Sequence, residues 1–159
     1  MRSARRVVVT GLGIVSPVGN DIATAWANVL AGRSGIGPIT NFDCSAFATR
    51  FAGQVRDFDV TQWVPMKDAR RMDPFIHYGI AAGIQAVRDA GFETVPESLR
   101  GRFGAAVAAG IGGISTIEKT TLAWHEGGPR KISPFFVPGT IIHMVAGQLA
   151  IMLGTKGPN

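Results

Sequence analysis

The residues most able to do chemistry lie close together in a proline-rich segment, residues 127–140. It holds two adjacent cations, Arg130 and Lys131, and two adjacent aromatic rings, Phe135 and Phe136. Cations in a rigid loop can bind an acidic partner, while large apolar rings can line a pocket or enter a neighbouring subunit. Ordinary anchoring of the loop in the core explains the two rings equally well on residue type alone. Residue type therefore leaves both interpretations of the two rings open, a binding surface and ordinary packing in the core.

Nucleophilic chemistry has one weak candidate. Cys44 is the single cysteine of the chain, and it lies between Asp43 and Ser45 in a polar turn. Nothing next to it in the sequence would lower the pKa of its thiol, as a catalytic cysteine requires. We therefore do not expect Cys44 to be a nucleophile, and we expect neither a metal site nor a cofactor.

The glycine-containing turn at residues 11–19 superficially resembles a dinucleotide-binding fingerprint. Ser16 stands where the third glycine or alanine belongs, and Pro17 would interrupt the start of a helix. No acidic residue ends a second strand at the proper interval. Nucleotide binding is therefore only a minor alternative.

A second basic group, Lys67, Arg70 and Arg71, precedes the longest expected helix. The chain has 16 Lys and Arg against 11 Asp and Glu, which gives a formal net charge of +5. The positive net charge favours an acidic partner. Three cations close together in a sequence are, however, often only part of a solvent-exposed face with no partner. No zinc-finger, homeodomain or RNP-type pattern is present, so we do not expect nucleic-acid binding.

The elements expected to position these residues alternate between strand and helix. Strands are expected at residues 5–10, 51–55 and 104–110. Helices are expected at residues 21–31, 73–90, 115–124 and 138–154. Asn20 is the expected cap of the first helix, whose apolar face is expected in the core. This order predicts a layered α/β fold with a mixed, mostly parallel sheet, in which the segment near residue 51 could pair antiparallel.

Length and composition fit one globular domain of 159 residues, 46% of them hydrophobic. No apolar run approaches the roughly 18 residues of a membrane span, and residues 7–9 are too short for the core of a secretion signal. We therefore expect no membrane contact, and the single cysteine favours a reducing cytoplasm. Residues 155–159 have the composition of a turn that enters another element, so we expect a truncated chain.

Five motifs occur in order along the chain. They are RRVVVTGLG at residues 5–13, SPVG at 16–19, RMDPF at 71–75, GIGG at 110–113 and PRKISPFFVP at 129–138. Together they resemble the N-terminal part of β-ketoacyl-acyl-carrier-protein synthases, and most closely the elongating type II class of bacterial fatty-acid synthesis. The likeness runs from about residue 5 to residue 159, and the last motif is the most specific.

The resemblance implies a thiolase-like fold, in which two similar halves pack their sheets between layers of helices. Residues 1–159 would be the N-terminal half-domain, and the C-terminal half and the nucleophile turn would lie outside this chain. Members of the family are homodimers that condense two thioesters. A cysteine takes the acyl chain from its carrier, malonyl-carrier loses CO₂, and the resulting carbanion attacks the acyl thioester.

The resemblance also assigns binding roles to residues of this chain. Ile111 matches the residue that gates the acyl pocket and influences chain length. Phe136, with Phe135 beside it, matches a residue that reaches across the dimer and lines the partner's pocket. The basic surface that receives the acidic helix of acyl carrier protein is matched by Lys67, Arg70, Arg71, Arg130 and Lys131.

The catalytic residues of the family have no match here. Its nucleophilic cysteine would follow a few residues after Asn159, and its two catalytic histidines belong to later motifs that His77, His125 and His143 do not match. We therefore expect no catalytic residue in this chain, and expect it to be inactive alone. The alternative is a non-catalytic partner subunit of a polyketide synthase, similar to a chain-length factor.

Overall fold

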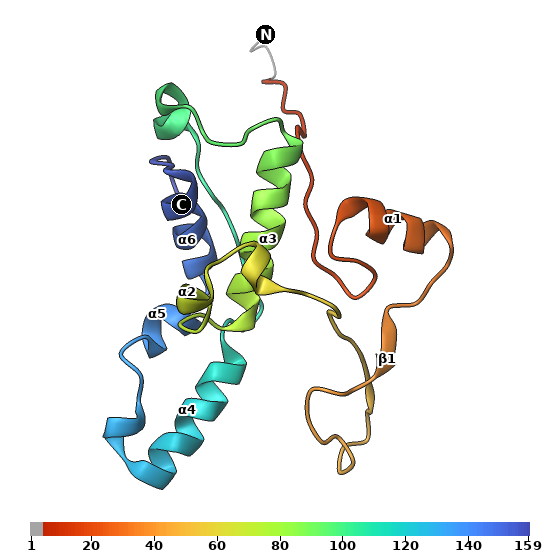
Figure 1. Ribbon diagram of the computed structural model, residues 1–159, viewed down its shortest axis with the longest axis vertical. Helices are drawn as coiled ribbons and strands as arrows, with labels where there is room; N and C mark the ends of the chain where they lie inside the picture. The colour runs from red at the N-terminus through yellow and green to blue at the C-terminus, as the bar shows by residue number, and fades with distance from the viewer. Residues whose placement is uncertain (1–4) are drawn as a thin grey trace.

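The computed structural model describes residues 5–159, and its centre is the 16-residue helix α3, Pro74–Asp89 (Figure 1). Helix α6, Met144–Leu153, lies beside α3. Helix α4, Ile114–Gly127, starts near the N-terminal end of α3 and extends away from it. We call residues 60–153 the body. Residues 5–53, which we call the arm, run along α3 and then project to one side.

Helix α3 begins and ends as the sequence predicts. Asp73 is its N-cap and Pro74 its first residue, where the missing N–H of proline costs nothing. Gly91 follows with a φ of +83°, a conformation that favours glycine and ends the helix. The apolar positions face inward, since Ile76 and Ile80 are fully buried.

Two glycines of α3 let α6 approach closely. A Cβ at Gly79 would overlap the side chain of Val145, and one at Gly83 would come within 2.7 Å of Leu149. The short helices η1, Val60–Gln62, and α2, Met66–Ala69, contact each other and add Val64 and Ala69 to the same core. The hydrophobic core therefore belongs to the body.

The first helix of the arm, α1, spans Ile22–Leu30. The prediction that Asn20 caps it is wrong by one residue. Asp21 is the cap and accepts a 2.8 Å hydrogen bond from the Thr24 N–H, while the Asn20 side chain donates to the Arg56 carbonyl. The prediction that its apolar face packs in a core is also wrong for this chain, because Trp26 is 61% exposed.

The sheet within residues 5–159 has two strands, β1, Ile36–Pro38, and β2, Phe51–Gly53. They pair antiparallel with Gly37 opposite Ala52, which confirms the antiparallel option for this segment. Each strand is only three residues long.

The other two expected strands do not form ladders in the described residues. Residues 7–9 are extended and exposed, and the Ala105 N–H of the second segment donates to the Pro158 carbonyl instead of to a strand. A strand is defined by a ladder of paired backbone groups. The second stretch, with Phe103 before it, has only two backbone hydrogen bonds to residues 157 and 158, which do not extend into a ladder. The mostly parallel sheet is thus not seen within residues 5–159 and stays a prediction.

The proline-rich segment is more helical than predicted. It contains η3, Pro129–Lys131, and α5, Phe136–Thr140, before α6 begins. The expected single helix over residues 138–154 is wrong, because Ile141 is extended and separates α5 from α6. Pro138 is compatible with a helix here because it lies in the first turn of α5, where its missing N–H breaks no hydrogen bond of the helix. The end at Gly154, with a φ of +65°, is confirmed.

The remaining elements are η2, Glu97–Arg102, between α3 and α4, and the extended residues 103–110. No helix in the described part of the chain combines the length and the apolar character that crossing a bilayer requires.

Candidate functional site

The clearest link between the predicted site residues is the contact of Arg71 with Phe135. The turn after α2 places the Arg71 guanidinium carbon 4.3 Å from the centroid of the Phe135 ring. A cation over an aromatic face at an exposed site contributes about 0.5–1 kcal/mol. A predicted carrier-binding cation and a predicted pocket residue are therefore in direct contact.

A small cleft of about 100 Å³ joins two of the predicted groups. It lies between the turn after α2, the start of α4 and the proline-rich segment. Its lining residues are Arg70, Arg71, Met72, Thr116, Ser133, Phe135 and Phe136. Four of the eight predicted site residues thus share one cleft, two of them basic and two aromatic.

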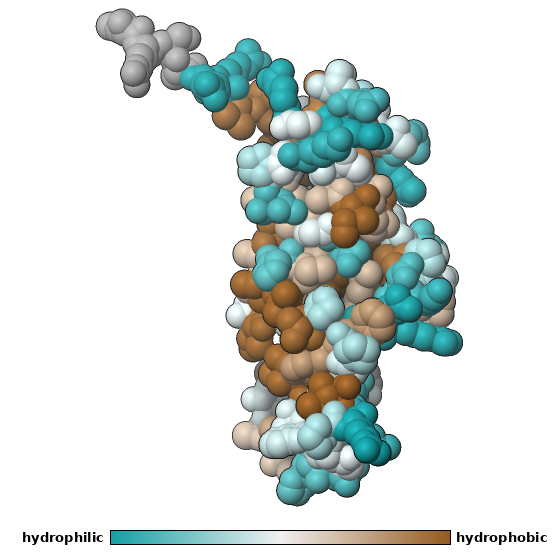
Figure 2. Space-filling model, turned by 90° about the vertical axis from the view of Figure 1, so that its left-hand side faces the viewer, coloured by the Kyte–Doolittle hydropathy of each residue, from teal (hydrophilic) through white to brown (hydrophobic). Residues whose placement is uncertain are grey.

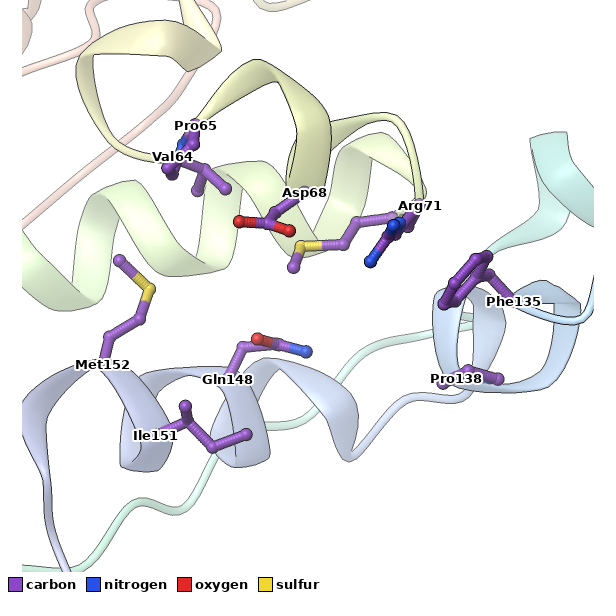
Figure 3. Close-up of a pocket in the computed structure, with 10 residues that line it drawn as sticks. Val64, Pro65, Asp68, Arg71, Phe135, Pro138, Gln148, Ile151 and Met152 are labelled. Carbon is purple, nitrogen blue, oxygen red and sulfur yellow. The ribbon is translucent and has the colours of Figure 1, made fainter.

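A larger cavity of about 400 Å³ lies on the other side of Arg71 and Phe135 (Figure 3). Helix α2 covers it from one side, α6 from the other, and α5 closes one end. Most of the residues that line the cavity are apolar. Asp68 and Gln148 add polar groups, and they lie on opposite sides of the cavity. An apolar cavity with a few polar groups is the usual form of a small-molecule site.

The apolar character of this region continues on the surface. Figure 2 shows hydrophobic residues gathered on the face that lies to the left in Figure 1. On α5, α6 and the link between them, the exposed large hydrophobic residues include Val137, Ile142, Ile151 and Met152. Ile151 and Met152 also line the larger cavity.

The other predicted site residues lie elsewhere. Ile111 is 70% exposed and lines neither of the two cavities beside Phe135. Lys67 is exposed on α2 outside both cavities. Arg130 and Lys131 are exposed on η3, at the end of α4 away from α3 (Figure 1). The five predicted carrier-binding cations therefore form two separate groups in this chain.

The glycines of the fingerprint-like turn have a packing role. A Cβ at Gly13 would come within 2.8 Å of the Ala86 nitrogen and of the Gln85 Cβ, and one at Gly11 would come within 2.6 Å of the Ala90 nitrogen. The space that phosphate would need beside these glycines is filled by α3. The turn is held there by Gln85, which exchanges hydrogen bonds with the backbone of Ile14.

Other potentially reactive residues show no catalytic arrangement. His77 has its Nε2 2.9 Å from the Ala69 carbonyl, a contact that ties α3 to α2. Cys44 is a free cysteine in the loop between β1 and β2. Within residues 5–159, no three His, Cys, Asp or Glu side chains gather as a metal site would require.

Two aspartates that accept hydrogen bonds from threonines, Asp21 and Asp59, lie away from the cleft. The Thr24 N–H and hydroxyl hold the pKa of Asp21 below its ordinary value, and the Thr61 hydroxyl and N–H do the same for Asp59. Neither aspartate lines a cavity beside Phe135.

Two features of this region were not predicted from the sequence. Asp68 and Gln148 enter the larger cavity, but they are separated by 80 positions and belong to no recognisable motif. Asp73 was expected only as the cap of its own helix, yet its side chain also accepts hydrogen bonds from Thr116. No local signal in the sequence indicates a contact between these two residues.

Residues 4–159 match the family model described as the N-terminal domain of β-ketoacyl synthase. The chain is 57% identical over 157 residues to 3-oxoacyl-[acyl-carrier-protein] synthase 2 of Vibrio harveyi and 48% identical over 155 residues to that of Coxiella burnetii. Nearly all of this chain is covered in both, but only 38% and 37% of those relatives.

Solved structures agree on the fold. The ishigamide ketosynthase/chain length factor has a TM-score of 0.79 at 30% identity and covers 98% of this chain and 39% of its own. A β-ketoacyl synthase from Burkholderia phymatum has a TM-score of 0.77 at 27% identity and covers 96% of this chain and 38% of its own. The match over residues 4–159 and these shared folds establish that the chain belongs to the β-ketoacyl synthase family, as its N-terminal domain.

Proposed function

We propose that the full-length protein is a β-ketoacyl-acyl-carrier-protein synthase of the elongating type II class. The observation that carries the proposal is the cleft in which Arg70 and Arg71 meet Phe135 and Phe136. A cationic rim beside aromatic walls suits a substrate with two parts, an acidic carrier and an apolar acyl chain. The 57% identity to a relative named 3-oxoacyl-[acyl-carrier-protein] synthase 2 supports the same reaction.

The proposed reaction is a decarboxylative Claisen condensation in two stages. A cysteine thiolate attacks the fatty acyl thioester, and the carrier thiol leaves with a proton. Malonyl-carrier then loses CO₂, and the carbanion attacks the acyl-cysteine carbonyl, so that the cysteine leaves as thiolate. We place the cysteine and the histidines that polarise the malonyl thioester outside residues 1–159. The role of this chain is therefore binding.

Three residues would contribute to the acyl pockets of the homodimer, one pocket in each subunit. Ile111 would gate the pocket of its own subunit, and its branched side chain resists rotation about χ1, so moving it aside favours only certain acyl chains. Phe136 and Phe135 would line the pocket of the partner subunit in a homodimer. The exposure of Ile111 in this chain is consistent with a surface that contacts further protein.

Acyl carrier protein would dock on the exposed cations. Lys67, Arg70 and Arg71 form one group and Arg130 and Lys131 the other, and all five are exposed. A ketosynthase of similar fold, with a TM-score of 0.74 at 24% identity, has been solved in complex with its type II polyketide synthase (PKS) acyl-carrier protein. Because exposed charges are screened within about 8 Å at physiological salt, docking should weaken as ionic strength rises.

We further propose that residues 1–159 are the N-terminal half-domain of a larger, cytoplasmic enzyme. Its mostly parallel sheet would form when residues 5–10 and 104–110 gain strand partners from the other half. The 38% coverage of the Vibrio harveyi relative is in keeping with this division. The alternative, a non-catalytic chain-length-factor-like subunit, has weaker support, since the ishigamide structure is only 30% identical.

The direct test is condensation of fatty acyl-carrier with malonyl-carrier by the full-length protein, followed by mass measurement of the thioester products. We expect a β-ketoacyl thioester two carbons longer, and no product from residues 1–159 alone. Product from the chain alone would contradict its assignment as a non-catalytic half. Release of CO₂ without any lengthened product from the full-length protein would contradict the elongating assignment.

The carrier surface is tested by reversing charge at Lys67, Arg70 and Arg71 in the full-length protein. We expect a raised KM for the carrier-borne substrate, a smaller change in kcat, and a difference from wild type that shrinks at high salt. Reversal at Arg5 and Arg6 is the matched control, because these cations belong to neither proposed group. An unchanged KM at low salt would show that α2 does not receive the carrier.

A further inference from the structure

Asp73 is a buried carboxylate with an unusual set of partners. It is 4% exposed, and its Oδ2 accepts hydrogen bonds from both the Thr116 N–H, at 2.9 Å, and the Thr116 hydroxyl, at 2.8 Å. Its Oδ1 accepts a longer bond of 3.4 Å from the Phe75 N–H. Burial of a charged group is costly unless hydrogen bonds compensate for the lost hydration, and here they come from two helices.

One carboxylate therefore caps two helix N-termini. Phe75 is the second residue of α3, and Thr116 is the third residue of α4. Helix α4 begins after Gly113, which has no side chain to serve as a cap. Asp73 supplies that function from 43 positions away, and its negative charge suits the positive ends of both helix dipoles.

The same residue is tied to the proline-rich segment through its backbone. The Asp73 N–H donates to the Gly139 carbonyl at 3.0 Å, and the Gly113 N–H donates to the Thr140 carbonyl at 2.8 Å. A Cβ at Gly113 would come within 2.7 Å of the Thr140 Cα, so the two segments are in close contact. Residue 73, the start of α4 and the end of α5 thus form one clamp.

The clamp lies between the proposed acyl-pocket residues. Ile111 precedes Gly113 by two residues, and Phe136 begins the helix that ends at Thr140. Thr116 also lines the small cleft together with Phe135 and Phe136. A shift of α4 relative to α3 would therefore move Ile111 relative to both rings.

We propose that Asp73 is a positioning residue that sets acyl-chain selectivity by holding the Ile111 segment in register with the Phe135–Phe136 segment through Thr116. This inference rests on the proposed function, in which Ile111 gates the acyl pocket of its own subunit and the two rings line the pocket of the partner subunit. The Asp73 clamp would then set the walls of both pockets. Asp73 itself touches no substrate. An asparagine cannot replace it fully, because its amide nitrogen donates and only its single oxygen can accept, which leaves one helix uncapped.

The test uses the full-length protein and its Asp73→Asn, Thr116→Val and Thr116→Ser variants. The readout is the ratio of condensation rates for a long and a short acyl-carrier substrate, together with the melting temperature. Asp21→Asn is the matched control, because Asp21 also accepts bonds from the N–H and hydroxyl of a threonine, Thr24, but within one helix of the arm. The melting temperature of each variant separates a loss of stability from a change in the rate ratio.

We expect Asp73→Asn and Thr116→Val to change the rate ratio by about threefold or more, equivalent to about 0.7 kcal/mol. Thr116→Ser keeps the hydroxyl and should retain the wild-type ratio, as should Asp21→Asn. An unchanged ratio in Asp73→Asn and Thr116→Val, with a lowered melting temperature only, would overturn the inference. If Asp73→Asn does not fold, Thr116→Val decides, since it removes one hydroxyl and leaves the carboxylate in place.

The proposed function has its own outcome in the same experiment. If wild-type protein condenses no acyl chain, the proposed function is wrong and the inference is lost with it. If wild type condenses and only the rate ratio fails to respond, the proposed function stands and the inference alone is wrong.

Discussion

The body and the arm have similar apolar patterns but bury them to very different extents. In α3, Ile80 at the apolar face is completely buried, whereas Leu30 at the apolar face of α1 is 70% exposed. The body packs because α3 and α6 are both present and fit each other through Gly79 and Gly83. Helix α1 has no such partner helix among the described residues. An amphipathic pattern thus predicts a buried face, but only a partner helix or sheet makes it buried.

The largest contrast should appear when one leucine or isoleucine is truncated in each region of the 159-residue chain. Ile80→Ala leaves a cavity in the core and should lower the free energy of unfolding by about 2–5 kcal/mol. Leu30→Ala should change it by less than about 0.5 kcal/mol, because that side chain is already in water. Urea unfolding followed by circular dichroism would measure both. Equal losses would mean that the arm is packed as firmly as the body.

A smaller effect is expected at the junction of arm and body. The Gln85 amide nitrogen donates to the carbonyls of Ile14 and Asn20, and its oxygen accepts from the Ile14 N–H. Each such bond contributes about 0.5–1.5 kcal/mol net, so Gln85→Ala should loosen the arm without unfolding the body. Hydrogen exchange should speed up at Ile14 and stay slow at Ile80.

Gln54→Ala provides the control for this prediction. Gln54 also accepts a backbone hydrogen bond, from Thr40, but this bond links the residues that follow β1 and β2 and does not involve α3. It should leave exchange at Ile14 unchanged. Faster exchange at Ile80 in Gln85→Ala would show that arm and body unfold together.

The smallest expected effect is on the stability of the folded chain at low pH. The Thr24 N–H, and then its hydroxyl, lower the pKa of Asp21 in the folded chain from the ordinary 3.8. A lowered folded-state pKa gives stability that is present above the ordinary value and is lost as the pH falls through the folded-state value. Asp21→Asn should therefore slightly reduce the loss of stability on acidification below 3.8. If the free energy of unfolding fell equally with pH in wild type and in Asp21→Asn, the Asp21 cap would have no measurable role in acid stability.

The sequence predicts those features that depend on neighbouring residues. The limits of α3 follow from Asp73, Pro74 and Gly91, and the end of α6 from Gly154, because caps and breakers act within one helical turn. The break between α5 and α6 was not predictable in this way. The apolar periodicity runs on across it, whereas the structure fixes it through contacts of Gly113 with Thr140.

The candidate site was predicted only in part for the same reason. The motif at residues 129–138 identifies Phe135 and Phe136, and the two basic groups are visible as clusters. That Arg71 stacks on Phe135, while Ile111 lies outside both cavities, depends on how three distant segments pack. The Asp73–Thr116 contact spans 43 positions and has no sequence signature.

The central proposal is that residues 1–159 are the N-terminal half-domain of a larger condensing enzyme, whose remaining part would cover the exposed side chains of the arm. Hydroxyl-radical labelling of Trp26 in the full-length protein tests it most directly, since this ring is 61% exposed in the isolated chain. We expect Trp26 to be labelled much more slowly in the native full-length protein than in the same protein unfolded in urea. Labelling as fast in the native protein as in the unfolded one would contradict it.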